Sequence, residues 1–273
     1  MIKGYNFAVT ANLMNILVLK LILAPVIIGS ASLAGRKWGP AVSGWIVGMP
    51  LTSGPVIFFV ALSHDATFAY NASLGTLSGG FSLVAFCLVY AWLALRFNWV
   101  VSTVGSLFAY GAITAWMQNV TIPFVPLFLG VFVVIVLGIR FMPKETEMEL
   151  VESKPGVWDI PSRILIGTSF ILFLTGIAPF IGPRLTGLLS TIPLYTAILT
   201  IYAHRLQGGM GAVHVLRGLL HGLFAFLGFF ITLCSLLPHA GIAVSFISAI
   251  IVALLVQGGS LVVMKQRDSS ATS

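Results

Sequence analysis

Long apolar runs separated by short polar stretches constrain this chain more than any other feature of its sequence. A run of about 20 apolar residues is the length of helix that crosses the hydrocarbon core of a bilayer. Only 8% of the 273 residues are charged and 58% are hydrophobic, which leaves too little polar surface to cover a water-soluble globule of this size. The sequence therefore predicts an all-α, polytopic helical membrane protein surrounded by membrane lipids. We expect about nine spans, near residues 16–34, 40–62, 69–95, 99–117, 122–141, 163–180, 184–203, 213–237 and 240–264.

The charge distribution and the missing motifs argue against several classes of function. The formal net charge is +7, but most Lys and Arg residues lie between apolar runs rather than in a patch, so nucleic acid is not an expected partner. Cys87 and Cys234 both fall inside apolar runs, where a thiol packs as a small hydrophobe, and we expect neither a metal site nor a cofactor. The sequence contains no GxSxG, HExxH, Walker or CxxC motif, so we expect no enzymatic activity.

The distribution of Lys and Arg between the loops predicts the orientation, because cytoplasmic loops of membrane proteins carry an excess of both. When the loops are assigned alternately to the two sides, the outer set contains only Lys3 and Arg184. The sequence therefore predicts a multi-pass protein of a bacterial inner membrane, with its N-terminus outside and its C-terminus in the cytoplasm. The first apolar run, followed by SASLA, also fits a cleaved signal peptide, but Arg36 and Lys37 directly after it argue for a retained helix. The predicted cytoplasmic set consists of Arg36, Lys37, Arg96, Arg140, Lys144, Lys154, Arg163, Arg205, Lys265 and Arg267.

The two halves of the chain align with each other at a constant shift of 143 positions. The segment GPAVSGWIVGMPLTS, which starts at Gly39, lies over GPRLTGLLSTIPLYT, which starts at Gly182, without a gap. Apolar bias aligns Leu with Leu, but it does not place Gly and Pro in register, so we interpret the halves as repeats of four spans each. Because the fifth span lies between them, matching helices are separated by an odd number of crossings, and we expect the repeats to be inverted. The predicted organisation is repeat one (1–118), a linker span with a cytoplasmic loop (119–162), repeat two (163–265) and a cytoplasmic tail (266–273).

Proline interrupts the second span of each predicted repeat. Inverted repeats recur in secondary transporters, whose binding sites lie near the middle of the membrane beside broken helices. Pro50 and Pro55 in GMPLTSGP leave two carbonyl groups without their helical donors, and Pro193 does the same in span seven. The neighbouring hydroxyls either satisfy those carbonyls or turn toward a ligand, and a purely structural kink is the alternative. The predicted substrate-binding residues here are Pro50, Thr52, Ser53, Pro193, Tyr195 and Thr196.

Span eight supplies two further candidates, because ionisable residues inside a membrane are functional candidates by default. His214, Arg217 and His221 are three and four positions apart, which places them along one helix face. Arg217 is a candidate for binding an anionic substrate and His221 for a proton path. The alternatives are an Arg217 that reaches the lipid headgroups and a His221 bonded to a neighbouring hydroxyl. All seven acidic residues lie outside the predicted spans, so we expect a neutral or anionic substrate rather than a cationic one.

Both halves contain a Gly, then a mid-helix Pro-Leu-Thr or Pro-Leu-Tyr-Thr, then a Gly-bearing third span, at Gly44, Pro50, Leu51 and Thr52 and their counterparts. This pattern, which covers one repeat at a time, resembles small bacterial four-span membrane proteins of the GlpM type. The resemblance implies that a four-span unit was duplicated and fused through the fifth span. It implies no particular activity.

These observations favour a secondary transporter of a small neutral or anionic solute, with alternating access about a site between spans two and seven. Three alternatives stay open: a flippase for a lipid-linked substrate, an assembly partner of another complex, and an intramembrane enzyme. Such an enzyme would use His221, Arg217, Tyr195 and the hydroxyls of span two without a nearby carboxylate, which is an incomplete set for acid–base chemistry. The sequence is also compatible with a homo-oligomer.

Overall fold

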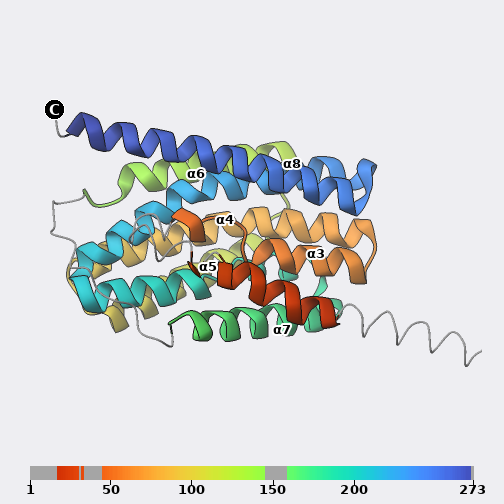
Figure 1. The fold of residues 1–273 in the computed structure, drawn as a ribbon, viewed down its shortest axis with the longest axis horizontal. Helices are drawn as coiled ribbons and strands as arrows, with labels where there is room; N and C mark the ends of the chain where they lie inside the picture. Colours follow the sequence, from red (N-terminus) through yellow and green to blue (C-terminus); the bar gives the residue numbers. More distant parts are fainter. Residues whose placement is uncertain (1–16, 31, 34–44, 145–158, 272–273) are drawn as a thin grey trace, which may run out of the picture.

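The structure is a computed structural model that describes residues 17–30, 32–33, 45–144 and 159–271, and in this part of the chain it contains helices and no strand. The predicted all-α class is confirmed. Figure 1 shows the helices packed side by side along the long axis of the molecule. In chain order they are a first helix, Leu17–Ser30, followed by α3 (Ser53–Ser63), α4 (Ala66–Ala94), α5 (Trp99–Asn119), α6 (Phe124–Phe141), α7 (Asp159–Ser190) and α8 (Leu194–Ala271).

Three glycines divide the two longest helices, α7 with 32 residues and α8 with 78. Gly182 interrupts α7 with a φ of 80°, and Gly208 and Gly241 interrupt α8 with φ values of 71° and 74°. Glycine enters this left-handed region without the steric cost that a Cβ atom imposes, so it ends one helical segment and begins the next. In Figure 1, α8 runs to one end of the molecule, turns, and returns toward the C-terminus. Single glycines therefore stand where short loops were predicted between the last four spans, from residue 163 to residue 264.

Side chains satisfy the backbone groups at helix ends where the chain reverses. The Asp65 carboxylate accepts a hydrogen bond of 2.7 Å from the backbone N–H of Phe68 and thereby caps the start of α4. At the C-terminal end of α5, the Arg184 guanidinium donates to the carbonyl of Met117 at 2.7 Å and to the carbonyl of Val120. Two charged residues of the predicted outer loops thus act as helix caps.

Four segments of the described chain are long and apolar enough to cross a membrane, as in helical membrane proteins. They are α4, α5, α6 and the 100-residue stretch Ile160–Gly259, which contains α7 and most of α8. Large apolar side chains cover the outside of the molecule, since Phe108 is 79% exposed and Phe180 is 87% exposed. Water would drive such a surface to aggregate, whereas lipid tails solvate it.

The interior is built around α4, which contacts α3, α5, α6, α7 and α8 (Figure 1). Small and hydroxyl side chains line its buried faces, and Ser73, Thr76 and Ser82 are fully buried. Such residues let neighbouring backbones approach closely and provide hydrogen bonds between helices, as when Thr114 of α5 donates to Ser82 at 2.9 Å. Buried hydroxyl groups therefore pair with one another among buried apolar side chains, while large apolar side chains cover the outer surface.

Candidate functional site

Two helices are interrupted at positions that are 143 residues apart. The first break, residues 48–52, directly precedes α3, and the second break, residues 191–193, separates α7 from α8. Proline has no N–H to donate to the carbonyl four residues before it. At Pro50 and at Pro193 that carbonyl accepts instead from the backbone N–H of the residue just before the proline. The backbone bonds of the first break recur at the second with the same spacing. At the first break the bonds are Gly48 N to Trp45 O (3.2 Å), Met49 N to Ile46 O (3.1 Å), Leu51 N to Met49 O (2.7 Å) and Gly54 N to Pro50 O (2.9 Å). At the second break, in the same order, they are Thr191 N to Leu188 O (3.3 Å), Ile192 N to Leu189 O (3.0 Å), Leu194 N to Ile192 O (2.8 Å) and Ala197 N to Pro193 O (2.7 Å).

Pro55 does not interrupt a helix, although the sequence predicted that it would. It lies in the first turn of α3, at the third residue of that helix. The first N–H groups of a helix have no partner within the helix, so a proline there removes no hydrogen bond. Pro55 therefore helps to begin α3, and the interruption of this span is due to Pro50.

Each break is anchored by a side chain from the other half of the chain. The carbonyl of Trp45, just before the first break, accepts a hydrogen bond of 2.9 Å from the side-chain amide of Gln257 in α8. The carbonyl of Leu188, its equivalent before the second break, accepts one of 3.0 Å from the hydroxyl of Tyr110 in α5. Backbone carbonyls at a helix interruption must be satisfied within a membrane protein, and here two distant helices satisfy them.

Glycines let the two breaks pack closely against other helices, again with the halves exchanged. A Cβ atom on Gly48 would lie 2.5 Å from the Cα atom of Gly222 in α8, so these two backbones touch. At the equivalent contact, a Cβ atom on Gly79 of α4 would lie 2.8 Å from the side-chain methyl of Thr191. Gly222 and Gly79 are 143 positions apart, as are Thr191 and Gly48, so the second contact is the first with the halves exchanged.

A small cavity, here called the central cavity, lies between the two breaks. Its volume is about 40 Å³, which is room for a few water molecules. Of the fifteen described residues that line it, twelve form six pairs related by the shift of 143 positions. Equivalent side chains of the two halves therefore face one space. The pairs are Val47 and Ser190, Gly48 and Thr191, Met49 and Ile192, Thr52 and Tyr195, Ser53 and Thr196, and Leu83 and Phe226.

Five of the eight residues predicted to bind substrate line the central cavity, namely Thr52, Ser53, Pro193, Tyr195 and Thr196. The hydroxyls of Thr52, Ser53 and Thr196 make no hydrogen bond with another described residue, so they can bind a ligand. The Tyr195 hydroxyl, by contrast, is used within the protein. It donates to the carbonyl of Ile28 at 3.2 Å and contacts the hydroxyl of Ser32, and so ties the cavity to the first helix.

A cation packs on an aromatic ring near the broken helix of each half. Lys20 of the first helix donates to the hydroxyl of Thr175 at 2.9 Å and lies 5.6 Å from the ring centre of Phe59 in α3. Arg163, its equivalent in the second half, is only 5% exposed, and its guanidinium lies 5.5 Å from the ring centre of Tyr195. Because Tyr195 lines the central cavity, a positive charge lies beside one residue of the cavity wall.

The remaining three predicted residues lie elsewhere. Arg217 donates a hydrogen bond of 2.6 Å to the carbonyl of Pro143, just beyond the end of α6. Nδ1 of His221 lies 2.8 Å from the carbonyl of Arg217, and because a carbonyl only accepts, this nitrogen carries the proton. Neither Arg217 nor His221 lines the central cavity. Pro50 lines a second, larger space on the other side of the first break.

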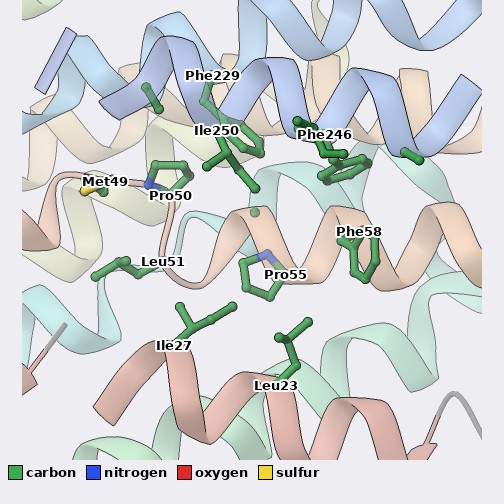
Figure 2. Close-up of a pocket in the computed structure, with 14 residues that line it drawn as sticks. Leu23, Ile27, Met49, Pro50, Leu51, Pro55, Phe58, Phe229, Phe246 and Ile250 are labelled. Atoms are coloured by element: carbon green, nitrogen blue, oxygen red, sulfur yellow. The ribbon is translucent and has the colours of Figure 1, made fainter. Parts of the chain in front are cut away.

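This second space, here called the apolar pocket, has a volume of about 510 Å³. It lies between the first helix, the first break with α3, and α8 (Figure 2). Met49 and Leu51 line both the apolar pocket and the central cavity, so the first break is the wall between the two spaces. The lining residues are Leu23, Ile27, Met49, Pro50, Leu51, Gly54, Pro55, Phe58, Phe229, Ala243, Phe246, Ile247, Ile250 and Ala253.

Tyr110 and Gln257, the two side chains that anchor the breaks, are not among the predicted site residues. Both lie inside apolar helices, where an unpaired phenol or amide is costly, and this isolation was a signal that each has a partner. Which carbonyl each one reaches depends on packing between distant helices. Spacing along the chain therefore could not identify the partners.

Comparisons with protein-family models, with curated proteins and with solved structures give no match. The resemblance to GlpM-type proteins therefore stays a prediction. Within the described part of the chain, no three His, Cys, Asp or Glu side chains lie together as a metal ion would require. The arrangement of the two breaks and the two spaces beside them is thus the basis for a functional assignment.

Proposed function

We propose that this protein is a secondary transporter of a small neutral or anionic solute, which binds in the central cavity between the two breaks. The observation that carries this proposal is the lining of the cavity by six pairs of equivalent residues. Two similar halves that share one site give a protein two similar conformations, one open to each side of the membrane. Exchange between those conformations would open the same site first to one side of the membrane and then to the other.

In this proposal the chain crosses a bacterial inner membrane about nine times, as two inverted four-span repeats joined by α6, with the N-terminus outside and the C-terminus in the cytoplasm. The turns at Gly182, Gly208 and Gly241 support the number of spans, because they divide a 100-residue apolar stretch that is far longer than one crossing. The anchors and glycine contacts support the repeats, since each pairs a break of one half with a helix of the other.

The residues around the central cavity favour a neutral or anionic solute. The hydroxyls of Thr52, Ser53 and Thr196 offer donors to a ligand, and Arg163 places a positive charge beside Tyr195. None of the fifteen described residues that line the cavity is Asp or Glu, so they offer no counter-charge to a cation. A volume of about 40 Å³ is small for a solute, and we interpret this conformation as the closed one between the two open states.

An intramembrane enzyme is less well supported than a transporter. Proton transfer needs a titratable group beside the reacting atoms, and among the described residues that line the cavity only Tyr195 is titratable. Its hydroxyl is already hydrogen-bonded to the first helix. His221, the predicted candidate for a proton path, does not line this space. An assembly partner without transport activity would not need a cavity that opens to both sides of the membrane. The following experiment tests for such opening and so distinguishes a transporter from an assembly partner.

Alternating access can be tested before the substrate is known. In a chain whose Cys87 and Cys234 are replaced by alanine, Thr52→Cys and Thr196→Cys are each labelled with a membrane-impermeant maleimide, in right-side-out and in inside-out vesicles. We expect each cysteine to react from both sides, because the cavity opens to each in turn. Thr168→Cys is the matched control, since Thr168 is a buried threonine of α7 outside the cavity, and it should react from neither side. Labelling of the cavity cysteines from one side only would contradict the proposal.

Once a solute is found by uptake screening in proteoliposomes, the same positions test binding. Thr52→Ala and Thr196→Ala each remove one hydroxyl from the cavity, and we expect the KM for uptake to rise roughly 2- to 10-fold. Thr168→Ala removes the same atoms elsewhere and should leave the KM unchanged. Normal uptake in both cavity variants would place the binding site elsewhere.

A further inference from the structure

We propose that the transported solute carries a hydrocarbon chain, and that this chain lies in the apolar pocket while its polar head binds at the central cavity. This inference rests on the proposed function and names its substrate class: an amphiphile with a small neutral or anionic head and a single lipid tail. The solute would therefore reach the protein from the bilayer.

The chemistry of the apolar pocket selects a hydrocarbon. The fourteen described residues that line it have no hydroxyl, amide, acidic or basic side chain, so none of them pairs with a polar ligand group. Its volume of about 510 Å³ falls within the range of sites that enclose small-molecule ligands. Phe58 and Phe246 meet edge to face with ring centres 5.1 Å apart, and Phe229 contacts Phe246 at 6.1 Å. These rings form a preformed apolar wall (Figure 2).

The pocket borders the lipid-facing surface of the protein. Ile247 and Ile250, which line it on α8, are 58% and 49% exposed, so the same helix face continues out toward the bilayer. On the opposite side, Leu23 and Ile27 of the first helix are only partly buried. A hydrocarbon chain can thus enter sideways between the first helix and α8 without passing through water.

The first break lies between this pocket and the central cavity. Met49 and Leu51 line both spaces, and Pro50 between them lines the apolar pocket, so a thin segment of chain separates hydroxyl groups from hydrocarbon walls. An amphiphile has the same division between its head and its tail. A soluble solute would use the central cavity alone and would leave the larger space without a role.

Energetics assigns different tasks to the two spaces. Lipid tails are as apolar as the pocket, so moving a hydrocarbon chain from the bilayer into it gains no hydrophobic free energy. The pocket therefore selects by shape, and the head at the central cavity supplies the preference over bulk lipid. Filling the pocket should exclude the chain sterically, whereas loss of a cavity hydroxyl should weaken binding of the head.

The inference can be tested with the full chain in phosphatidylcholine nanodiscs and with palmitic acid that carries a mid-chain diazirine. After illumination we expect adducts at Phe58, Phe229 and Phe246, and excess unlabelled palmitic acid should compete with them. Ala243→Trp fills the pocket from α8 and should reduce these adducts to background. Val244→Trp is the matched control, because Val244 is the next residue, is 54% exposed and does not line the pocket.

The outcomes separate this inference from the proposed function. Adducts spread over the outer surface, at Phe108 and Phe180 as much as in the pocket and unchanged in Ala243→Trp, would indicate surrounding lipid only and overturn the inference. If two-sided labelling of Thr52→Cys and Thr196→Cys persisted in that case, transport would stand and its solute would have no chain. Pocket adducts without two-sided labelling would overturn both, and would leave a fixed lipid site.

Discussion

The two breaks share one pattern of backbone hydrogen bonds, but different contacts hold them in place. At the second break the Thr191 hydroxyl donates to the carbonyl of Leu188 at 2.7 Å, and the hydroxyl of Tyr110 lies 3.0 Å from both groups. At the first break the equivalent of Thr191 is Gly48, whose backbone packs against that of Gly222. One break is therefore held by a cluster of hydroxyl bonds and the other by close backbone contact.

This difference leads us to expect that the two breaks differ in mobility. Hydrogen bonds between buried hydroxyls fix direction and distance, so we expect the second break to be the more rigid side of the central cavity. Among the described residues the first break has fewer such bonds, and it separates the cavity from the apolar pocket, so we propose that it is the side that moves when a ligand enters. The following predictions test this contrast and the exchange of halves on which it depends.

The largest expected effect concerns the inversion of the two halves. Arg96, in the turn between α4 and α5, and His239, next to the turn at Gly241, are both exposed and are 143 positions apart. If the repeats are inverted, single cysteines at these positions react with an impermeant maleimide from opposite sides of the membrane. We expect all-or-none labelling, at residue 96 from the cytoplasmic side and at residue 239 from the outside. Labelling of both from one side would rule out inverted repeats.

The next effect concerns the backbone contact at the first break. In Gly222→Ala the new methyl would lie 2.8 Å from the Cα atom of Gly48, and neither backbone can yield easily. We expect a loss of roughly 1–3 kcal/mol in the free energy of unfolding, measured by equilibrium unfolding in mixed micelles. Gly176→Ala is the control, because a Cβ atom there meets nothing within 4 Å and alanine favours the helix. Equal stability of the two variants would contradict a tight contact at the first break.

A smaller effect is expected at the second break. Tyr110→Phe removes the hydroxyl that reaches both Leu188 and Thr191, while the Thr191 hydroxyl still satisfies the carbonyl. We expect a loss of about 1 kcal/mol in unfolding free energy, near the upper part of the range for hydrogen bonds between membrane helices. Thr191→Val should remove part of the same cluster, so the double variant should lose less than the sum of the two single losses. Additive losses would show that the two hydroxyls act independently.

The helical class and the positions of both breaks could be predicted because each depends on local chemistry. Apolar runs of membrane length determine the helices, and the missing N–H of Pro50 and of Pro193 determines where two of them are interrupted. Single-glycine turns were not predicted, because a glycine in an apolar run is common in membrane helices and its φ is settled only by how the following helix packs. Gly182 and Gly241 are such cases.

The candidate site was predictable only in part, for the same physical reason. Thr52, Ser53 and Thr196 follow the prolines closely in sequence, so the spacing that predicts the breaks also brings these hydroxyls beside them. Arg217 and His221 are predicted site residues because they are ionisable within a predicted span. The space that each side chain faces, however, depends on contacts with residues far along the chain, such as that of Arg217 with Pro143. Long-range packing of this kind leaves no periodic signal in a sequence.

The smallest expected effect is at the anchor of the first break. Gln257→Leu removes one hydrogen bond to the carbonyl of Trp45, which still accepts from the N–H of Gly48, so we expect a loss of about 0.6 kcal/mol in unfolding free energy. This loss should be smaller than that of Tyr110→Phe if backbone packing holds the first break. Because the first break is the proposed moving wall, Gln257→Leu should nevertheless speed maleimide labelling of Thr52→Cys more than Tyr110→Phe does. A larger stability loss in Gln257→Leu, with unchanged labelling rates, would instead make the first break the rigid one.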